Sequence, residues 1–533
     1  MSNRSPRPAT GVDRRLPSAF ASLVLVLVAI IGPTVVYLST PYGLGLRDDS
    51  YSYVTGAVSL AQGTGYGRLT GDGSLNPITN FPPLYSLALA LPARLGIDVR
   101  VFARTLNGLL FGVTTLIGLM AVYGSTGSVF YAGFGAGLLL GSLTLIEQFT
   151  WLQSEPLFLC LQLLALVAIA SYIHRPPRPV FLWLAAIASS LGAFTRFVGL
   201  GLILACGMAL VLLLRKPLSA RLKEAMSFMA VAVAPMIAFT IRNFAVKGSA
   251  ANRPAPFWHP PPPEVWRGGL VLFLKWLLPD RVAAFLTDSS SMSLVTFLFL
   301  SVGAIWLGLR LARRANATSS PSLVLSHLSV QALFCLVYLG LIVFTVLLLD
   351  RLTPIDERIL APLHLSILLI LALAAAHLSG SSSARARLSV AILCLGFAAF
   401  QIYRSGLIVE SLARDGHGYS SERWRTSPTL AYARGLPAVP IFSNNLPAMY
   451  FIAGRTAYAI PSPTNLSNLE PNPSYGNELE EMRHLLRQGD GFLVLVGFAP
   501  TDVQGAEEWR ILTAGLLPVQ GSSEGIVYRA AEP

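Results

Sequence analysis

Charged side chains are scarce in this sequence. Asp, Glu, Lys and Arg make up only 12% of the 533 residues, whereas hydrophobic residues make up 53%. A soluble protein carries about twice that charged fraction, so the composition excludes an ordinary soluble enzyme. The mean hydropathy of +0.59 agrees, and the chain is predicted to be a membrane protein with many spans.

Cysteine and histidine are also rare, with four and seven copies. The four cysteines, at positions 160, 206, 335 and 394, all lie in apolar segments. This placement favours packing within the membrane over disulfides or metal ligation. His259 has no partner at the spacing of a metal-ligand pair, so the sequence offers no support for a zinc site.

The positive net charge does not indicate nucleic-acid binding. The formal charge is +12, but the basic residues fall in short loops between apolar stretches and are not gathered in one domain. A nucleotide-binding loop has little support. The run Gly63-Thr64-Gly65-Tyr66-Gly67 lacks the preceding strand and following helix that such a loop needs.

Windows of about 20 apolar residues predict the membrane spans. There are eleven, near 18–39, 101–122, 128–147, 156–173, 180–196, 198–214, 225–245, 293–311, 325–349, 357–377 and 388–408. The first is preceded by Arg14 and Arg15, is too long for the apolar core of a signal peptide and has no cleavage site after it. The chain is therefore predicted to have a tail at 1–17, a transmembrane domain at 18–408 and a C-terminal domain at 409–533.

The C-terminal domain has no predicted span. Alternating runs at Val439–Ser443, Phe492–Val496 and Ile526–Tyr528 predict strands. Glu478–Arg487 is amphipathic with acidic residues in its first turn, which predicts a helix. The fold class is therefore mainly α, a polytopic helix bundle, with a small C-terminal α/β domain.

Arginine and lysine mark alternate loops and so predict the orientation. They occur in the N-terminal tail and after the predicted fourth, sixth, eighth and tenth spans. Because loops rich in these residues remain in the cytoplasm, the tail is predicted to be cytoplasmic. The C-terminal domain and the first outer loop, residues 40–100, then lie on the opposite, exoplasmic face.

The Asp48-Asp49 couplet is the first candidate for chemistry. It follows the first span directly and lies on the predicted outer face. Holding two carboxylates in order at a membrane surface costs free energy, so such residues indicate a functional site. The couplet is therefore interpreted as the centre of the chemistry.

Three further charged positions share that face, and each has a simpler interpretation. Glu155 opens the fourth span, where it would also favour the helix dipole. Arg196 interrupts apolar sequence. Its simpler interpretation is an arginine whose side chain extends to the membrane interface, and its functional interpretation is a guanidinium that binds a phosphate through two hydrogen bonds. Asp356-Glu357-Arg358 lies between two spans, where its charges would also be solvated or mutually paired.

These motifs together resemble a family. The Asp couplet, Pro82-Pro83-Leu84-Tyr85, Glu155, Thr195-Arg196-Phe197-Val198-Gly199 and Asp356-Glu357-Arg358 occur in an order that is similar to the C-type (GT-C) glycosyltransferases. The nearest similarity is to bacterial members of the protein O-mannosyltransferase and aminoarabinose (lipid A) transferase group. Each motif is short, and their order and common face carry the resemblance.

The resemblance implies transfer of a sugar from a polyprenyl-phosphate donor to an acceptor hydroxyl, with inversion at the anomeric carbon. It implies that Asp48 is the general base, with Asp49 in support, and that Glu155 is the second acidic residue. Arg196 would contact the lipid phosphate, and Arg358 and Tyr85 would contribute to donor binding. Some branches hold a divalent metal, so Asp49 and Glu155 are candidate ligands of Mg²⁺ or Mn²⁺.

The implied partners are a polyprenyl-phosphate sugar, the lipid bilayer and an acceptor that is a protein, a glycolipid or a cell-wall glycan. No nucleic acid is expected. The implied location is the bacterial cytoplasmic (inner) membrane, and the C-terminal domain would cover the acceptor side or regulate it.

Two alternatives stay open. A flippase or transporter for lipid-linked glycans is one, although transporters place charges near the membrane midplane and often show internal repeats, and neither is evident here. A polysaccharide polymerase or ligase is the other. Such enzymes usually have a large outer loop that bears arginines and lack the early Asp couplet.

Overall fold

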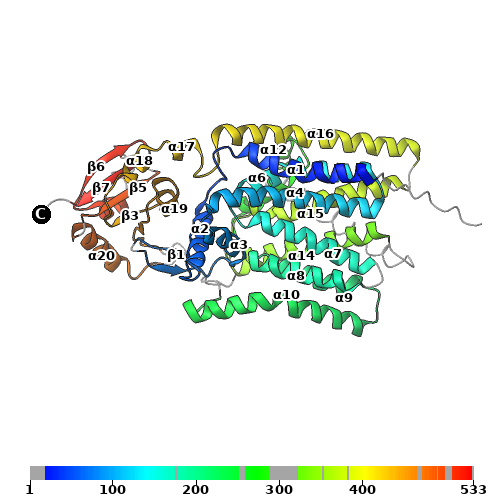
Figure 1. The fold of residues 1–533 in the computed structure, drawn as a ribbon, viewed down its shortest axis with the longest axis horizontal. Helices are drawn as coiled ribbons and strands as arrows, with labels where there is room; N and C mark the ends of the chain where they lie inside the picture. Colours follow the sequence, from blue (N-terminus) through cyan, green and yellow to red (C-terminus); the bar gives the residue numbers. More distant parts are fainter. Residues whose placement is uncertain are drawn as a thin grey trace, which may run out of the picture.

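The fold is that of a computed structural model, with a bundle of long helices at one end and a small α/β domain at the other (Figure 1). It describes residues 18–71, 73–174, 178–250, 258–288, 322–350, 353–380, 383–464, 471–488, 490–497 and 507–530. The predicted tail at 1–17 and the predicted span at 293–311 lie outside these ranges.

Helices occupy the other ten predicted spans. They are α1 (Ser18–Ser39), α4 (Val99–Thr126), α5 (Val129–Leu140) with α6 (Leu143–Thr150), α7 (Glu155–His174), α8 (Pro179–Thr195), α9 (Gly199–Leu213), α10 (Leu218–Lys247), α14 (Leu323–Leu348), α15 (Glu357–Gly380) and α16 (Ala384–Asp415). Six of them are long and apolar enough to cross a membrane alone, or seven spans if the bent pair α5 and α6 is one. The helices α8 and α9, with 17 and 15 residues, are shorter. The chain is a multi-pass membrane protein.

The predicted third span, 128–147, is bent. The helices α5 and α6 meet at an angle of 53°, and the break falls at Gly141 and Ser142. The Ser142 hydroxyl accepts a hydrogen bond from the backbone of Leu145, which caps α6, and it contacts Nε2 of His364 at 2.7 Å. A buried polar pair therefore holds the bend, and α6 leads the chain toward the start of α7.

Glycine lets α1 and α4 approach closely. A Cβ added to Gly32 would lie 2.4 Å from the backbone nitrogen of Gly112, so only glycine fits. Gly108 contacts Pro33 in the same interface. Small residues four positions apart are typical of close helix pairs in membranes, and this pair fixes where the chain leaves the bundle after α1.

The first outer loop is folded. It contains α2 (Asp48–Ala61), the antiparallel strands β1 (Gly67–Leu69) and β2 (Leu75–Pro77), and α3 (Leu84–Arg94). The helix α2 begins at the Asp couplet itself. Its two carboxylates lie in the first turn, where the helix dipole stabilises negative charge. Between α10 and α14 the chain forms two short helices, α11 (Pro263–Lys275) and α12 (Asp280–Phe285).

The C-terminal part is an α/β unit, in agreement with the predicted strands and helix. It comprises α17 (Glu422–Arg425), α18 (Pro428–Arg434), β3 (Ile441–Ser443), α19 (Leu446–Ala448), η1 (Met449–Ala453), β4 (Tyr458–Ala459), α20 (Tyr475–Gln488), β5 (Phe492–Val496), α22 (Glu507–Thr513), β6 (Leu516–Ser522) and β7 (Gly525–Ala530). The strand order is β4-β3-β5-β7-β6. The strand β3 is parallel to β4 and β5, while β7 is antiparallel to β5 and β6. All five residues of β5 are buried, so this strand is the centre of the unit.

A short extended segment joins the bundle to the C-terminal unit. The Gly45 nitrogen donates to the carbonyl of Thr150 at 2.8 Å, and the Leu152 nitrogen donates to the Gly45 carbonyl at 2.9 Å. On the other side, the Tyr419 nitrogen donates to the Leu46 carbonyl at 2.9 Å. Residues 45 and 46 therefore lie between two other chain segments, and the Asp couplet follows directly at the junction.

Candidate functional site

Arg358 bridges two carboxylates that are far apart in the sequence. Its Nη1 lies 2.6 Å from Oδ2 of Asp49, and its Nε lies 2.8 Å from Oε1 of Glu155. The Arg358 and Asp49 side chains are only 25% and 23% exposed. One guanidinium therefore joins α2, α7 and α15.

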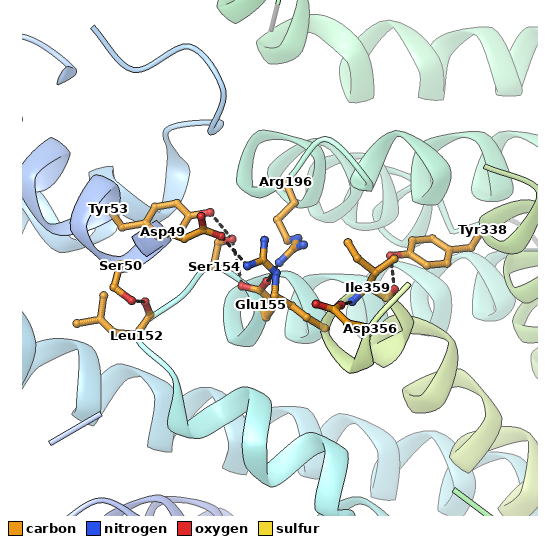
Figure 2. Close-up of polar contacts among 11 residues, drawn as sticks. Asp49, Ser50, Tyr53, Leu152, Ser154, Glu155, Arg196, Tyr338, Asp356 and Ile359 are labelled. Carbon is orange, nitrogen blue, oxygen red and sulfur yellow. Dashed lines mark hydrogen bonds and ion pairs between the residues drawn. The ribbon is translucent and has the colours of Figure 1, made fainter. Parts of the chain in front are cut away.

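Arg196 completes the cluster. Its Nη1 forms an ion pair with the same Oε1 of Glu155, and the two side chains are 10% and 4% exposed. Figure 2 shows Arg196 close to Glu155, with Asp49 nearby. Asp49, Glu155, Arg196 and Arg358 are called the charged cluster below. Its formal charge is zero, with two carboxylates and two guanidinium groups.

The breaks between helices position these side chains. Glu155 is the first residue of α7. Arg196 directly follows α8 and has an extended backbone, which ends that helix before α9 begins. Arg358 lies in the first turn of α15, whose start is held by two contacts. Asp356 accepts a hydrogen bond from the nitrogen of Ile359 at 2.9 Å, and the Tyr338 hydroxyl donates to the Ile359 carbonyl at 3.0 Å. Figure 2 shows these contacts beside the cluster.

Hydrogen bonds also hold α2 against the start of α7. Ser50 donates to the carbonyl of Leu152 at 2.8 Å, and the Tyr53 and Ser154 hydroxyls lie 2.8 Å apart. Ser154 is 3.5 Å from Oε2 of Glu155. Ser50 and Ser154 are fully buried, so these bonds are shielded from water and fix the position of Asp49 (Figure 2).

Asp48 points away from the charged cluster. Its Oδ1 accepts a hydrogen bond of 2.7 Å from the hydroxyl of Tyr419, at the entry to the C-terminal unit. Burial and the adjacent Asp48 carboxylate raise the pKa of Tyr419, so its hydroxyl stays protonated and donates. Within the described ranges Asp48 has no ion pair, and it is exposed.

Tyr85, predicted to contribute to donor binding, has no direct contact with the charged cluster among the described residues. It is fully buried in α3, and its ring packs edge-on against Tyr53 with the ring centres 5.2 Å apart. Its hydroxyl has no hydrogen-bond partner among the described residues. The structure thus brings together Asp49, Glu155, Arg196 and Arg358 directly, and it links Tyr85 to them only through Tyr53.

Sequence reasoning missed a second group beside the couplet. The Arg47 guanidinium lies 3.6 Å from the centre of the Trp151 ring, and the His417 ring lies 3.6 Å from the same ring, centre to centre. Burial and the charge of Arg47 lower the pKa of His417 to about 3, so its imidazole is neutral at physiological pH. The position of Arg47 next to the couplet was the available signal. Nothing in the sequence pointed to His417 or Tyr419.

The cluster does not fit a divalent metal in this arrangement. Asp49 and Glu155 were the candidate ligands, but both point their oxygens at Arg358, which would repel a cation. Groups of three or more potential ligands close enough to hold a metal do not occur in the part of the chain that the structure describes. No step is therefore assigned to Mg²⁺ or Mn²⁺.

The arrangement is suited to binding an anion next to the Asp48 carboxylate, which has no ion pair among the described residues. A guanidinium carries five N–H donors, and the cluster's ion pairs engage one nitrogen of Arg196 and two of Arg358. Donors therefore remain for the oxygens of a phosphate, in a site that is largely shielded from water. Asp48, one residue from Asp49, is an exposed carboxylate that accepts a hydrogen bond from Tyr419.

Comparison with solved structures identifies the fold. The chain is similar to ArnT from Cupriavidus metallidurans bound to undecaprenyl phosphate, with a TM-score of 0.56, 13% identity, and coverage of 97% of this chain and 100% of that one. It is also similar to the Archaeoglobus fulgidus oligosaccharyltransferase in complex with zinc and sulfate, with a TM-score of 0.54, 13% identity, and coverage of 94% and 72%. The complex of the oligosaccharyltransferase AglB from Archaeoglobus fulgidus with an inhibitory peptide and a dolichol-phosphate gives a TM-score of 0.52, 11% identity, and coverage of 96% and 75%.

No protein-family profile matches the chain, and no curated protein sequence matches it. At these identities the structural likeness establishes the fold alone. The chain has the GT-C fold, which confirms the fold class that the motifs predicted.

Proposed function

We propose that this chain, which has the GT-C fold, is an inverting glycosyltransferase. It moves a sugar from a polyprenyl-phosphate donor to an acceptor hydroxyl on the exoplasmic face of the membrane. The observation that carries the proposal is Arg358, which bridges Asp49 and Glu155 beside the buried Arg196. This cluster combines phosphate-binding groups with a neighbouring base at the outer end of a membrane bundle.

The reaction is a single displacement. The acceptor oxygen attacks the anomeric carbon, its proton passes to a carboxylate, and the bond between that carbon and the phosphate oxygen breaks. The polyprenyl phosphate leaves with the electron pair. Because a phosphate is already a good leaving group, the site needs positive charge and a base more than an acid. Arg196 and Arg358 supply the positive charge.

Asp48 is the better candidate for the base. Oδ2 of Asp49 lies 2.6 Å from Nη1 of Arg358, so this carboxylate faces a guanidinium and not an incoming hydroxyl. Asp48 accepts one hydrogen bond from a neutral phenol and is exposed, so it is accessible to an acceptor. A positioned base contributes about 10²–10⁴-fold in rate. Asp49 then holds Arg358 in place.

The distribution of basic residues supports the orientation. The junctions between α7 and α8 and between α9 and α10, and the start of α16, lie at the end of the bundle opposite the C-terminal unit (Figure 1). These segments contain Arg178, Arg215, Lys216 and Arg385. Because basic ends of this kind tend to remain cytoplasmic, this distribution supports an exoplasmic position for the couplet and the C-terminal unit. In a bacterium this membrane is the cytoplasmic (inner) membrane.

The lipids in two similar structures support the donor class. The ArnT structure contains undecaprenyl phosphate, and the AglB structure contains a dolichol-phosphate. Both are phosphates of long isoprenoid chains. The charged cluster of this protein offers donors of the kind that such a phosphate requires. The acceptor is a hydroxyl on a protein, a glycolipid or a cell-wall glycan.

The test uses purified protein in detergent with a panel of polyprenyl-phosphate sugars. Release of polyprenyl phosphate is followed by mass spectrometry, and the anomeric configuration of the product is read by NMR. The proposal expects release from at least one donor, dependent on acceptor, with inversion. Retention of configuration would contradict the mechanism. After reconstitution of the protein in vesicles, movement of the intact donor across the bilayer without bond cleavage would favour the flippase alternative.

A further inference from the structure

A groove separates the first outer loop from the C-terminal unit. Its larger part has a volume of about 810 Å³ and is lined by residues that include Val54, Val58, Arg100, Arg434, Phe451 and Ile452. A smaller hollow of about 250 Å³ shares four of these residues, Arg100, Arg434, Phe451 and Ile452. The two hollows are therefore adjacent, and together they are called the outer groove.

Residues near Asp48 and Tyr419 in the sequence line the outer groove, although neither of these two residues lines it. The smaller hollow is lined by Leu46 and Ser420. Leu46 lies two positions before Asp48, and Ser420 follows Tyr419, whose hydroxyl contacts the Asp48 carboxylate. The lining includes none of the four residues of the charged cluster. The outer groove thus approaches the couplet from the side that faces the C-terminal unit.

The charge of the groove is positive. Arg100, Arg425 and Arg434 line it, and all three are exposed. Among the described residues that line it, the only acidic one is Asp98. Asp98 is already neutralised by Arg100 at 3.2 Å, and it caps α4 by accepting a hydrogen bond from the Arg100 nitrogen at 2.7 Å. The formal sum is three positive charges and one negative charge, which favours an anionic occupant.

The walls of the groove also suit a sugar. Phe451 and Tyr450 line it and pack edge-on against each other, with ring centres 5.4 Å apart. Aromatic and apolar walls with a few charged groups are typical of sites for organic ligands. A purely inorganic anion would leave the apolar wall formed by Val54 and Val58 unused.

We propose that the outer groove binds the acceptor, and that this acceptor is an acidic saccharide, one that carries carboxylate or phosphate groups. The inference rests on the proposed function and adds the chemical class of the second substrate. The acidic groups contact Arg100 and Arg434, the sugar rings lie against Phe451, and the reacting hydroxyl reaches Asp48 through the smaller hollow. Donor and acceptor then approach the couplet from opposite sides.

The test measures binding of a fluorescent hexagalacturonate to the full-length protein in detergent, with maltohexaose as the neutral control. Hexagalacturonate is expected to bind at least tenfold more tightly than maltohexaose. Arg434→Glu is expected to weaken its binding at least tenfold, whereas Arg434→Lys, which keeps the charge, retains most of it. Arg487→Glu removes an exposed arginine of α20 that does not line the groove, and it should leave binding unchanged.

Equal binding of the acidic and neutral probes would overturn the proposal, as would unchanged binding by Arg434→Glu. A soluble short-chain phosphatidylglycerol is the third probe. If it binds in an Arg434-dependent way and hexagalacturonate does not, the groove is a lipid headgroup site and the proposal fails. Donor binding separates this failure from failure of the proposed function, because Arg434→Glu should still bind the polyprenyl-phosphate donor with unchanged affinity.

Discussion

The hydroxyl of Tyr419 lies 2.7 Å from Oδ1 of Asp48, although 371 positions separate the two residues in the sequence. This contact links the C-terminal unit to the proposed base. Asp49, the next residue, faces Arg358 instead. The couplet is therefore divided between two surroundings, one formed by the bundle and one by the C-terminal unit.

Tyr419→Phe should slow sugar transfer several-fold, because the Asp48 carboxylate loses the hydrogen bond that orients it. The loss should appear in kcat and leave the apparent KM for the donor unchanged, since Tyr419 is not part of the charged cluster. Tyr432→Phe, at an exposed tyrosine of α18, is the control. Wild-type kcat in Tyr419→Phe would show that this contact has no role in the reaction.

Glu155→Gln should destabilise the protein. Its side chain is 4% exposed and compensates both Arg196 and Arg358, and removing one partner of a buried ion pair costs about 3–5 kcal/mol. A clear fall in Tm is expected in detergent. Glu224→Gln is the matched control, because its ion pair with Lys216 is more exposed, at 19% and 27%.

A second substitution tests the cause. In the double variant Glu155→Gln with Arg196→Gln, one uncompensated guanidinium is removed, so part of the lost stability should return. The two residues are not coupled if the loss of stability in the double variant equals the sum of the losses in Glu155→Gln and Arg196→Gln.

The neutral state of His417 predicts a pH dependence of stability. Burial and Arg47 lower its pKa from 6.5 to about 3 in the folded protein. Between these values the unfolded chain binds more protons than the folded one, so stability falls as the pH falls below about 6.5. His417→Gln should therefore lose less Tm between pH 7 and pH 5 than the wild type. His484→Gln, at an exposed histidine of α20, should follow the wild type, and parallel curves for all three proteins would refute the assignment.

The bundle and most of the charged cluster were predictable from the sequence. Apolar runs long enough to cross a bilayer mark the helices, and basic loops place Glu155, Arg196 and Arg358 on the same face as the couplet. Arg196 interrupts apolar sequence and Glu155 opens a predicted span, and a charge that is buried at such a position must be compensated. The ion pairs of Arg358 with Asp49 and Glu155 follow from that need, although their geometry does not.

The division of the couplet was harder to predict. Consecutive residues of an α-helix point about 100° apart, so Asp48 and Asp49 face different partners once α2 begins at Asp48. No helix start at Asp48 was predicted from the sequence, so the two carboxylates were treated as one unit. Tyr419 and His417 reach the site through contacts over some 370 positions, and no local pattern reports such contacts.

Chelation should not affect the reaction. Arg358 occupies the space between Asp49 and Glu155 that a divalent cation would need, so EDTA should leave the rate of transfer unchanged. Added Mg²⁺ or Mn²⁺ should have no effect either. The control is the same assay with the metal readded after chelation. A rate that falls with EDTA and recovers with Mn²⁺ would mean that Arg358 moves away to admit a metal.

The most direct test compares Asp48→Asn and Asp49→Asn in a transfer assay with the polyprenyl-phosphate donor identified from the panel. Asp48→Asn should lower kcat by about 10²-fold or more and still bind the donor, because it leaves the charged cluster intact. Asp49→Asn should weaken both transfer and donor binding, because it frees Arg358. Full activity in both single variants would contradict the assignment of the couplet as the centre of the chemistry.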